Sequence, residues 1–159
     1  MKIRVGFGSD VHALVPDRAL WLGGIKIEHT LGLQGHSDAD VLIHAICDAL
    51  LGAANMRDIG YHFPDTAGAY KDIDSKILLR DTLKLLREKG YELGNIDATV
   101  CAEQPKLKNH IPTMQQTLAE VMAVDPDDIS IKATTSEKLG FTGRQEGISA
   151  YATVLITKN

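Results

Sequence analysis

The sequence predicts a single α+β domain, residues 1–159, in which one mixed β-sheet carries its helices on one face. The length suffices for one domain with its own core. An apolar fraction of 44% and a charged fraction of 24% are typical of globular proteins. Segments with the two-residue period of strands alternate with segments of helical period, and they predict the order strand, hairpin, helix, helix, strand, helix, strand, strand.

Composition argues against several classes of partner. The formal net charge is −4, and no basic run interleaved with aromatic residues indicates nucleic-acid binding. No secretory signal is visible, and no apolar stretch approaches the roughly 18 residues that span a bilayer. Cys47 and Cys101 have no metal-like spacing, so we expect two reduced cysteines. These observations predict a cytoplasmic protein that binds neither nucleic acid nor membrane.

The first strand is predicted at residues 2–8, where apolar side chains alternate with others. Gly6 and Gly8 lack the third glycine and the following helix of a dinucleotide-binding motif. We expect them instead to let the backbone bring Asp10 and His12 into place. Because residues two apart in an extended chain face the same way, these two side chains should project together from the end of the strand.

A helix is predicted after residue 40, because Ser37 and Asp40 form a capping-box variant before an apolar run that ends near Gly52. Asp40, His44 and Asp48 are spaced four apart and should form one polar row on this helix. A carboxylate, an imidazole and a carboxylate in a row are typical of a metal ligand with supporting partners.

The two stretches together predict a metal site. A single helical histidine is more often exposed or part of a satisfied core, and aspartates near a helix start usually just complement its dipole. Asp10, His12 and His44, however, supply two imidazoles and one carboxylate, the three-ligand set of a catalytic zinc with an open fourth position.

The remaining elements follow from periodicity and turn residues. They are a hairpin over residues 19–28 that turns at Gly23 and Gly24, helices over 75–89 and 110–123, and strands over 96–102, 129–133 and 147–157. In the helix over 75–89 the predicted inward residues are Ile77, Leu78, Leu83, Leu85 and Leu86. Both faces of the last strand are partly apolar, which predicts a symmetric oligomer built sheet against sheet.

Three loops carry further polar candidates. Residues 55–66 contain Asp58 and Asp65, although the pattern alone favours an ordinary connection. Residues 103–108 hold two lysines that face either an anion or solvent. The loop over 134–147 is rich in hydroxyl groups and glycine, which suits phosphate oxygens, but a polar turn explains it equally well. Glu137 in that loop is a candidate ligand for a second, hard cation.

Taken in order, these motifs closely resemble the 2-C-methyl-D-erythritol 2,4-cyclodiphosphate synthase family of the non-mevalonate isoprenoid pathway. The resemblance spans essentially the whole chain. It rests on Asp10-Val-His12, residues 36–44, the loop from Asp58 to Thr66, Ala102 to Lys106, and Lys132 to Arg144. Each motif alone is weak, whereas the ordered combination is specific.

The resemblance implies a homotrimer with active sites between subunits. It implies Zn²⁺ on Asp10, His12 and His44, and Mg²⁺ or Mn²⁺ held by Glu137 and the diphosphate, with His36 and Thr135 stabilising the transition state. The implied substrate-binding residues are Ser37, Asp58, Ile59, Gly60, Phe63, Pro64, Asp65, Thr66 and Ala67 for the methylerythritol phosphate, Ala102, Glu103, Gln104, Pro105, Lys106, Leu107 and Lys108 for the cytidine, and Thr134, Ser136, Phe141 and Arg144 on the phosphate side.

Arg144 and Glu146 also fall where the family closes a cavity on the trimer axis that holds an isoprenoid diphosphate. The sequence departs from the family pattern at Ser9, where a bulky residue is common, and at Ser136, where a third threonine is expected and the hydroxyl is retained.

The implied reaction converts 4-diphosphocytidyl-2-C-methyl-D-erythritol 2-phosphate to a cyclic diphosphate and CMP. The 2-phosphate of the substrate is the nucleophile, so no activated serine or cysteine is needed, and positioning with charge neutralisation carries the catalysis. Two alternatives stay open. One is a zinc phosphohydrolase that activates water at the open metal position. The other is a non-catalytic sensor of nucleotide or isoprenoid diphosphate.

Overall fold

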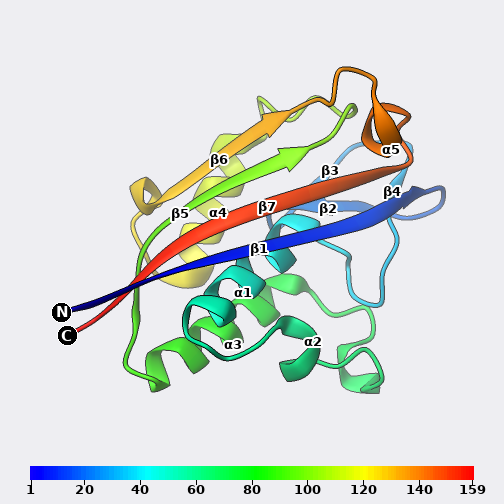
Figure 1. The fold of residues 1–159 in the computed structure, drawn as a ribbon. Coiled ribbons are helices and arrows are strands. Elements are labelled where there is room, and N and C mark those ends of the chain that lie inside the picture. Colours follow the sequence, from blue (N-terminus) through cyan, green and yellow to red (C-terminus); the bar gives the residue numbers. More distant parts are fainter.

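A computed structural model describes all 159 residues of the chain (Figure 1). Five strands form one sheet in the order β4-β1-β7-β5-β6, and β2 and β3 form a separate hairpin. The strands are β1 (Lys2–Val15), β2 (Leu20–Leu22), β3 (Ile25–Ile27), β4 (Gly32–Leu33), β5 (Glu92–Cys101), β6 (Ile129–Thr134) and β7 (Gly147–Lys158). The helices are α1 (Val41–Ala53), α2 (Ile59–His62), α3 (Ser75–Glu88), α4 (Ile111–Met122) and α5 (Gly140–Gly143), with single 3-10 turns η1 (Gly68–Tyr70) and η2 (Pro126–Asp128).

The predicted mixed sheet with helices on one face is confirmed. β5 and β6 pair in parallel, and the other strand pairs of the large sheet are antiparallel. The long helices α1, α3 and α4 lie on the same side of this sheet, with α1 under the strands and α3 packed on α1 and α4 (Figure 1). A core of 35 buried residues fills the space between these layers. No helix combines the length and the apolar character that crossing a bilayer requires.

β1 is longer than predicted. It pairs with β7 from Lys2 opposite Lys158 to Ala13 opposite Gly147, and this long ladder keeps the chain extended to Val15. Asp10 therefore lies inside β1 rather than at the end of a shorter strand. Cross-strand pairing over this distance cannot be read from local alternation.

The two glycines of β1 also have a different role from the predicted one. A Cβ atom on Gly6 would lie 1.9 Å from the carbonyl oxygen of Ala49, and one on Gly8 would lie 2.0 Å from that of Ala45. Glycine is thus required because the backbone of α1 packs directly on β1. This close approach places the α1 side chain His44 over the strand.

Smaller differences concern helix ends and inward faces. Asp40, not Ser37, caps α1 by accepting a hydrogen bond from the N–H of Ile43 at 3.1 Å. Gly52 lies inside this helix rather than beyond its end. In α3, Ile77 is 36% exposed and Leu79, not predicted, is fully buried. The loops over 55–66 and 134–147 contain the one-turn helices α2 and α5.

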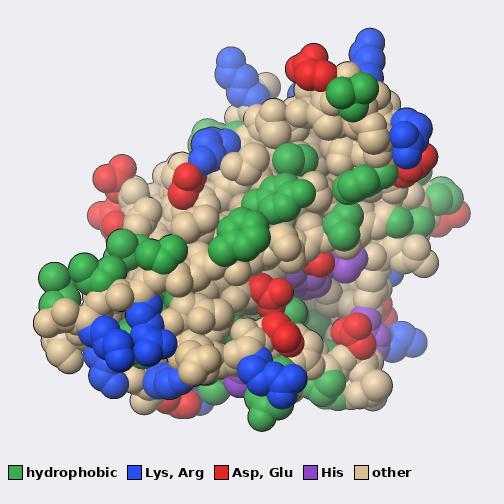
Figure 2. All heavy atoms as spheres, viewed as in Figure 1, with side chains coloured by type: hydrophobic (Ala, Val, Ile, Leu, Met, Phe, Trp, Pro, Cys, Tyr) green, Lys and Arg blue, Asp and Glu red, His purple; other side chains and the backbone are tan.

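The uncovered face of the sheet is apolar. Figure 2 shows hydrophobic side chains gathered along β1 and β7, where Phe7 is 63% exposed and its ring stacks with that of Tyr151. The exposed hydrophobic side chains on these two strands are Ile3, Val5, Phe7, Val11 and Tyr151. Exposed apolar patches of this kind are typical of interaction surfaces.

Candidate metal centre and substrate pockets

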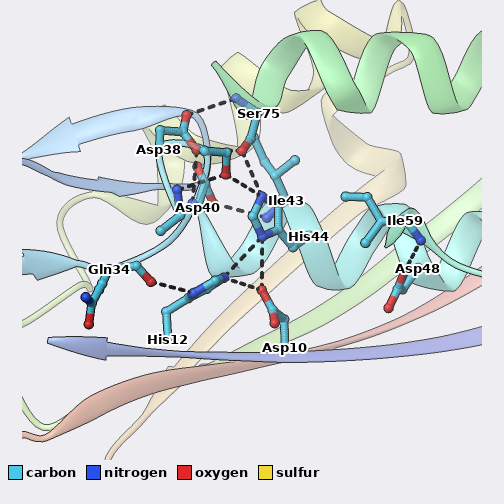
Figure 3. Close-up of polar contacts among 12 residues, drawn as sticks. Asp10, His12, Gln34, Asp38, Asp40, Ile43, His44, Asp48, Ile59 and Ser75 are labelled. Carbon is cyan, nitrogen blue, oxygen red and sulfur yellow. Dashed lines mark hydrogen bonds and ion pairs between the residues drawn. The ribbon is translucent and has the colours of Figure 1, made fainter. Parts of the chain in front are cut away.

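Asp10, His12 and His44 meet at the junction of β1 and α1 (Figure 3). Asp10 Oδ2 lies 2.8 Å from His12 Nε2 and 3.0 Å from His44 Nδ1, and the two nitrogens are 3.3 Å apart. Two residues of β1 separated by one position supply the first pair, and the first turn of α1 supplies the third. The predicted convergence of these three side chains is confirmed.

The donor set fits a divalent metal ion. Zinc bonds to imidazole nitrogen and carboxylate oxygen are about 2.0–2.1 Å long, so ligand atoms around a tetrahedral ion are about 3.3 Å apart. The observed separations of 2.8–3.3 Å therefore need only a small expansion to admit an ion. Three protein ligands leave the fourth position open, as in catalytic sites.

Each histidine has a partner for its other ring nitrogen. His12 Nδ1 lies 2.8 Å from the carbonyl oxygen of Gln34, and His44 Nε2 lies 2.9 Å from Ser75 Oγ and 3.2 Å from Ser37 Oγ. A carbonyl can only accept, so Nδ1 of His12 carries a proton, and Nε2 is the ring nitrogen that is available to bind a metal ion. These outer contacts orient the rings for metal binding.

Contacts within the triad shift the pKa values of Asp10 and His12. Burial would raise the pKa of Asp10, but hydrogen bonds and charge attraction from His12 and His44 outweigh it and hold this pKa well below its usual range. Burial likewise would lower the pKa of His12, yet Asp10 raises it above 6.5 overall. The cluster therefore keeps Asp10 ionised, as a metal ligand must be.

Of the predicted polar row on α1, only His44 joins the candidate metal site. Asp40 is fully buried and accepts hydrogen bonds from the N–H groups of Gly23 and Gly24 at 3.0 and 2.7 Å, so it ties the hairpin turn to the start of α1. Asp48 accepts from the N–H of Ile59 at 2.8 Å. Burial raises the pKa of both carboxyls. Neither carboxylate supports His44, which corrects the sequence-based interpretation.

A first cavity of about 200 Å³ opens beside the triad. It contains the predicted residues Asp10, His12, His36, Ser37, His44, Ile59, Gly60, Phe63 and Asp65, together with Asp48, Tyr70, Ile73 and Leu78. His36 Nε2 is buried and has no hydrogen-bond partner in the chain. A buried polar atom without a partner is costly, so this nitrogen is suited to a ligand in the cavity.

A second cavity of about 270 Å³ lies between the end of β6 and the start of α4. It contains the predicted residues Ala102, Pro105, Lys106, Leu107, Lys108, Thr134 and Thr135, together with Ile111 and Ala133. The two cavities share no residue. A single chain thus does not bring the predicted site residues into one pocket.

Other predicted residues lie outside both cavities. Asp58 caps α2, Glu103 Oε1 accepts the N–H of Lys138 at 2.7 Å, and Arg144 pairs with Glu146 at 2.8 Å. Glu137 lies 3.3 Å from Thr135 Oγ1 and does not join the triad. The full set outside the cavities is Asp58, Pro64, Thr66, Ala67, Glu103, Gln104, Ser136, Glu137, Phe141 and Arg144.

The family follows from a match over nearly the whole chain. The sequence model of the YgbB family matches residues 3–157. The chain belongs to this family. It is 87% identical over 158 residues to the 2-C-methyl-D-erythritol 2,4-cyclodiphosphate synthase of Parabacteroides distasonis, covering 99% of this chain and 98% of that protein. It is 76% identical over its full length, and that of the relative, to the synthase of Bacteroides thetaiotaomicron. The resemblance inferred from the motifs is confirmed.

Solved structures of YgbB relatives share the fold. The bifunctional IspDF of Campylobacter jejuni superposes with a TM-score of 0.96 at 44% identity, covering 99% of this chain, which spans 43% of that longer protein. The CDP complex of IspF from Plasmodium falciparum gives a TM-score of 0.87 at 36% identity, covering 99% of this chain and 97% of that chain.

Sequence reasoning about this YgbB member missed the support of His44. Asp38 accepts hydrogen bonds from both the N–H and the hydroxyl of Ser75. Asp38 lies in the motif over residues 36–40, and Ser75 is the first residue of the helix predicted over residues 75–89. Their contact spans 37 positions, so no local period could indicate it.

Proposed function

We propose that the chain converts 4-diphosphocytidyl-2-C-methyl-D-erythritol 2-phosphate to 2-C-methyl-D-erythritol 2,4-cyclodiphosphate and releases CMP. The observation that carries the proposal is an Asp–His–His cluster opening into a cavity in which His36 presents an unpartnered nitrogen. Relatives 76–87% identical over essentially the whole chain bear the name of this synthase, and the ordered motifs are those of the same family.

Asp10, His12 and His44 would hold Zn²⁺, whose preference for nitrogen and carboxylate ligands this set meets. Glu137 would hold Mg²⁺ or Mn²⁺ together with the diphosphate, because these cations favour oxygen ligands. When bound, the two ions would supply positive charge to phosphate oxygens and lower the repulsion between the reacting groups.

The side chains of the protein supply position and hydrogen bonds rather than a nucleophile. The 2-phosphate of the substrate is already an anion, and it attacks the β-phosphorus while CMP leaves. A ring N–H of His36 and the hydroxyl of Thr135 would stabilise the charge that develops on the phosphoryl oxygens. Holding the two phosphates in line accounts for much of the rate.

The two cavities divide the substrate between them. Ser37, the loop from Asp58 to Ala67 and the rest of the first cavity would bind the methylerythritol phosphate. Residues 102–108 would bind the cytidine in the second cavity, with Thr134, Ser136, Phe141 and Arg144 on the phosphate side. A CDP complex of a relative supports a cytidine subsite.

We propose a homotrimer in which each active site combines the first cavity of one chain with the second cavity of its neighbour. The apolar outer face of β1 and β7 supports burial against other copies. Three Arg144–Glu146 pairs would then close an axial cavity for an isoprenoid diphosphate. We place the enzyme in the cytoplasm, consistent with two unpaired cysteines.

Product analysis tests the reaction. The purified protein is incubated with the cytidyl substrate, zinc and magnesium, and phosphorus NMR follows the products. CMP and a cyclic diphosphate in equal amounts are expected, and His44→Ala should form neither. Intact substrate after incubation of the zinc-loaded wild type would refute the proposed activity.

Subunit mixing tests the shared site. His44→Ala damages the first cavity and Thr135→Ala the second, so each homotrimer should be inactive. If sites lie between chains, random co-assembly restores about a quarter of them, because one interface in four pairs two intact halves. Sites contained within single chains would recover no activity on mixing.

A further inference from the structure

The two metal-binding histidines are held by unlike partners. His12 Nδ1 donates to the backbone carbonyl of Gln34 at 2.8 Å. His44 Nε2 instead faces side-chain hydroxyls, with Ser75 Oγ at 2.9 Å and Ser37 Oγ at 3.2 Å. Only the His44 contact can therefore be altered by substituting a side chain.

The directions of the hydrogen bonds from Asp38 through Ser75 to His44 determine which ring nitrogen of His44 carries a proton. Asp38 is fixed by the N–H groups of Ser75 at 2.9 Å and Asp40 at 3.1 Å, and it accepts the hydroxyl proton of Ser75 (Figure 3). Because that proton points at Asp38, the oxygen of Ser75 turns a lone pair toward His44 Nε2. The imidazole then carries its proton on Nε2 and leaves Nδ1 free for a metal ion.

The surroundings favour Ser75 over Ser37 as the acceptor. Ser75 is fully buried as the first residue of α3, and its hydroxyl has a charged partner. Ser37 Oγ is farther from the ring and already accepts the N–H of Ala39 at 3.1 Å. A hydrogen bond relayed to a carboxylate is stronger than one between neutral groups.

We propose that Asp38 and Ser75 are positioning residues that fix the tautomer and ring orientation of His44 and so set the metal affinity of the site. The inference rests on the proposed metal site and adds two residues that touch neither metal nor substrate. Such outer partners typically contribute about 10- to 100-fold to metal affinity.

Zinc affinity, measured by competition with a chromophoric chelator, tests the pair without any turnover. Ser75→Ala and Asp38→Asn should each weaken zinc binding by about 10- to 100-fold. Ser37→Ala should weaken it less, and Gln34→Ala should leave it unchanged because the carbonyl acceptor of His12 remains. Unchanged affinity in both Ser75→Ala and Asp38→Asn would overturn the proposal.

Ring ¹⁵N NMR of histidine-labelled protein separates tautomer control from simple loss of structure. In the zinc-loaded wild type His44 should show a protected proton on Nε2, and in Ser75→Ala this signal should exchange rapidly. Thermal unfolding of the metal-free variants reports folding separately. A protected Nε2 proton that persists in a folded Ser75→Ala variant would overturn the relay.

Zinc binding and product formation together separate the positioning role of Asp38 and Ser75 from the proposed cyclisation. If the wild type bound no zinc, the metal site and the role of the pair would fall together. If it bound zinc and lost affinity in the variants but formed no cyclic product, the proposed reaction would fall and the positioning role would stand.

Discussion

Gly8→Ala tests the claim that the metal site depends on direct contact between the backbones of β1 and α1. The new Cβ atom would lie 2.0 Å from the carbonyl oxygen of Ala45 and 2.6 Å from the amide nitrogen of Ala49. Carbon–oxygen contacts are normally at least about 3.3 Å, so the helix must recede by about 1.3 Å. Both obstructing atoms are backbone, so no rotamer change relieves the clash.

A shift of that size separates His44 on α1 from Asp10 and His12 on β1. Metal sites need ligand distances within about 0.2 Å, so zinc affinity should fall by more than the ~100-fold typical of losing an outer hydrogen-bonding partner. Overpacking should also lower the free energy of unfolding by about 1–3 kcal/mol. Chelator competition measures the first effect and urea denaturation of the metal-free protein the second.

Gly52→Ala is the matched control. It makes the same substitution in α1, where nothing lies within 4 Å of the added Cβ atom. Replacing an interior helical glycine should stabilise the protein by about 0.5–1 kcal/mol with zinc affinity unchanged. Wild-type zinc affinity in Gly8→Ala would refute the reasoning, because the site would then tolerate a displaced helix.

Three other predictions follow from the same contacts. Asp40→Ala leaves three buried N–H groups without their acceptor. It should lower the free energy of unfolding, measured by urea denaturation, by about 3–5 kcal/mol, and a decrease below about 1 kcal/mol would contradict this prediction. In the metal-free protein Asp10 raises the pKa of His12 above its usual value of 6.5, so protonated His12 stabilises the folded state. This stabilisation is complete below pH 6.5 and is lost as the pH rises through the pKa of His12 in the folded protein. The melting-temperature difference between wild type and His12→Gln should therefore shrink from about pH 6 to pH 8, and a constant difference would count against the pairing. If the chain forms the proposed trimer, Phe7→Glu should dissociate it in analytical ultracentrifugation, since each buried phenylalanine contributes about 1.5–3 kcal/mol. Ile77→Glu on α3 should leave the assembly intact. An assembly that persists in Phe7→Glu would exclude this face as the subunit interface.

Much of the fold could be predicted because its signals are local. The alternation in β7, the helical period of α3 and the double-glycine turn between β2 and β3 each lie within about a dozen residues, and the structure has all three. The convergence of the three candidate metal ligands was predictable for the same reason. Asp10 and His12 share a strand face, and His44 is the histidine on a helix that must pack against that strand.

What the sequence could not indicate depends on contacts between distant segments. Gly6 and Gly8 were expected to let the backbone bring Asp10 and His12 into place, because only the packed α1 backbone reveals that a side chain is impossible there. Asp40 was predicted to support His44, whereas its buried carboxylate accepts hydrogen bonds from the N–H groups of the hairpin turn. The separation of the candidate site into two cavities is likewise a property of the folded chain.

The origin of the oxygen atoms in the products tests the central claim most directly. The zinc- and magnesium-loaded protein is incubated with the cytidyl substrate in ¹⁸O-labelled water, and the products are analysed by mass spectrometry. Intramolecular attack by the 2-phosphate predicts CMP and a cyclic diphosphate without any label from solvent. Label in the released phosphate species would show that water is the nucleophile, and the protein would then be a zinc phosphohydrolase rather than a cyclase.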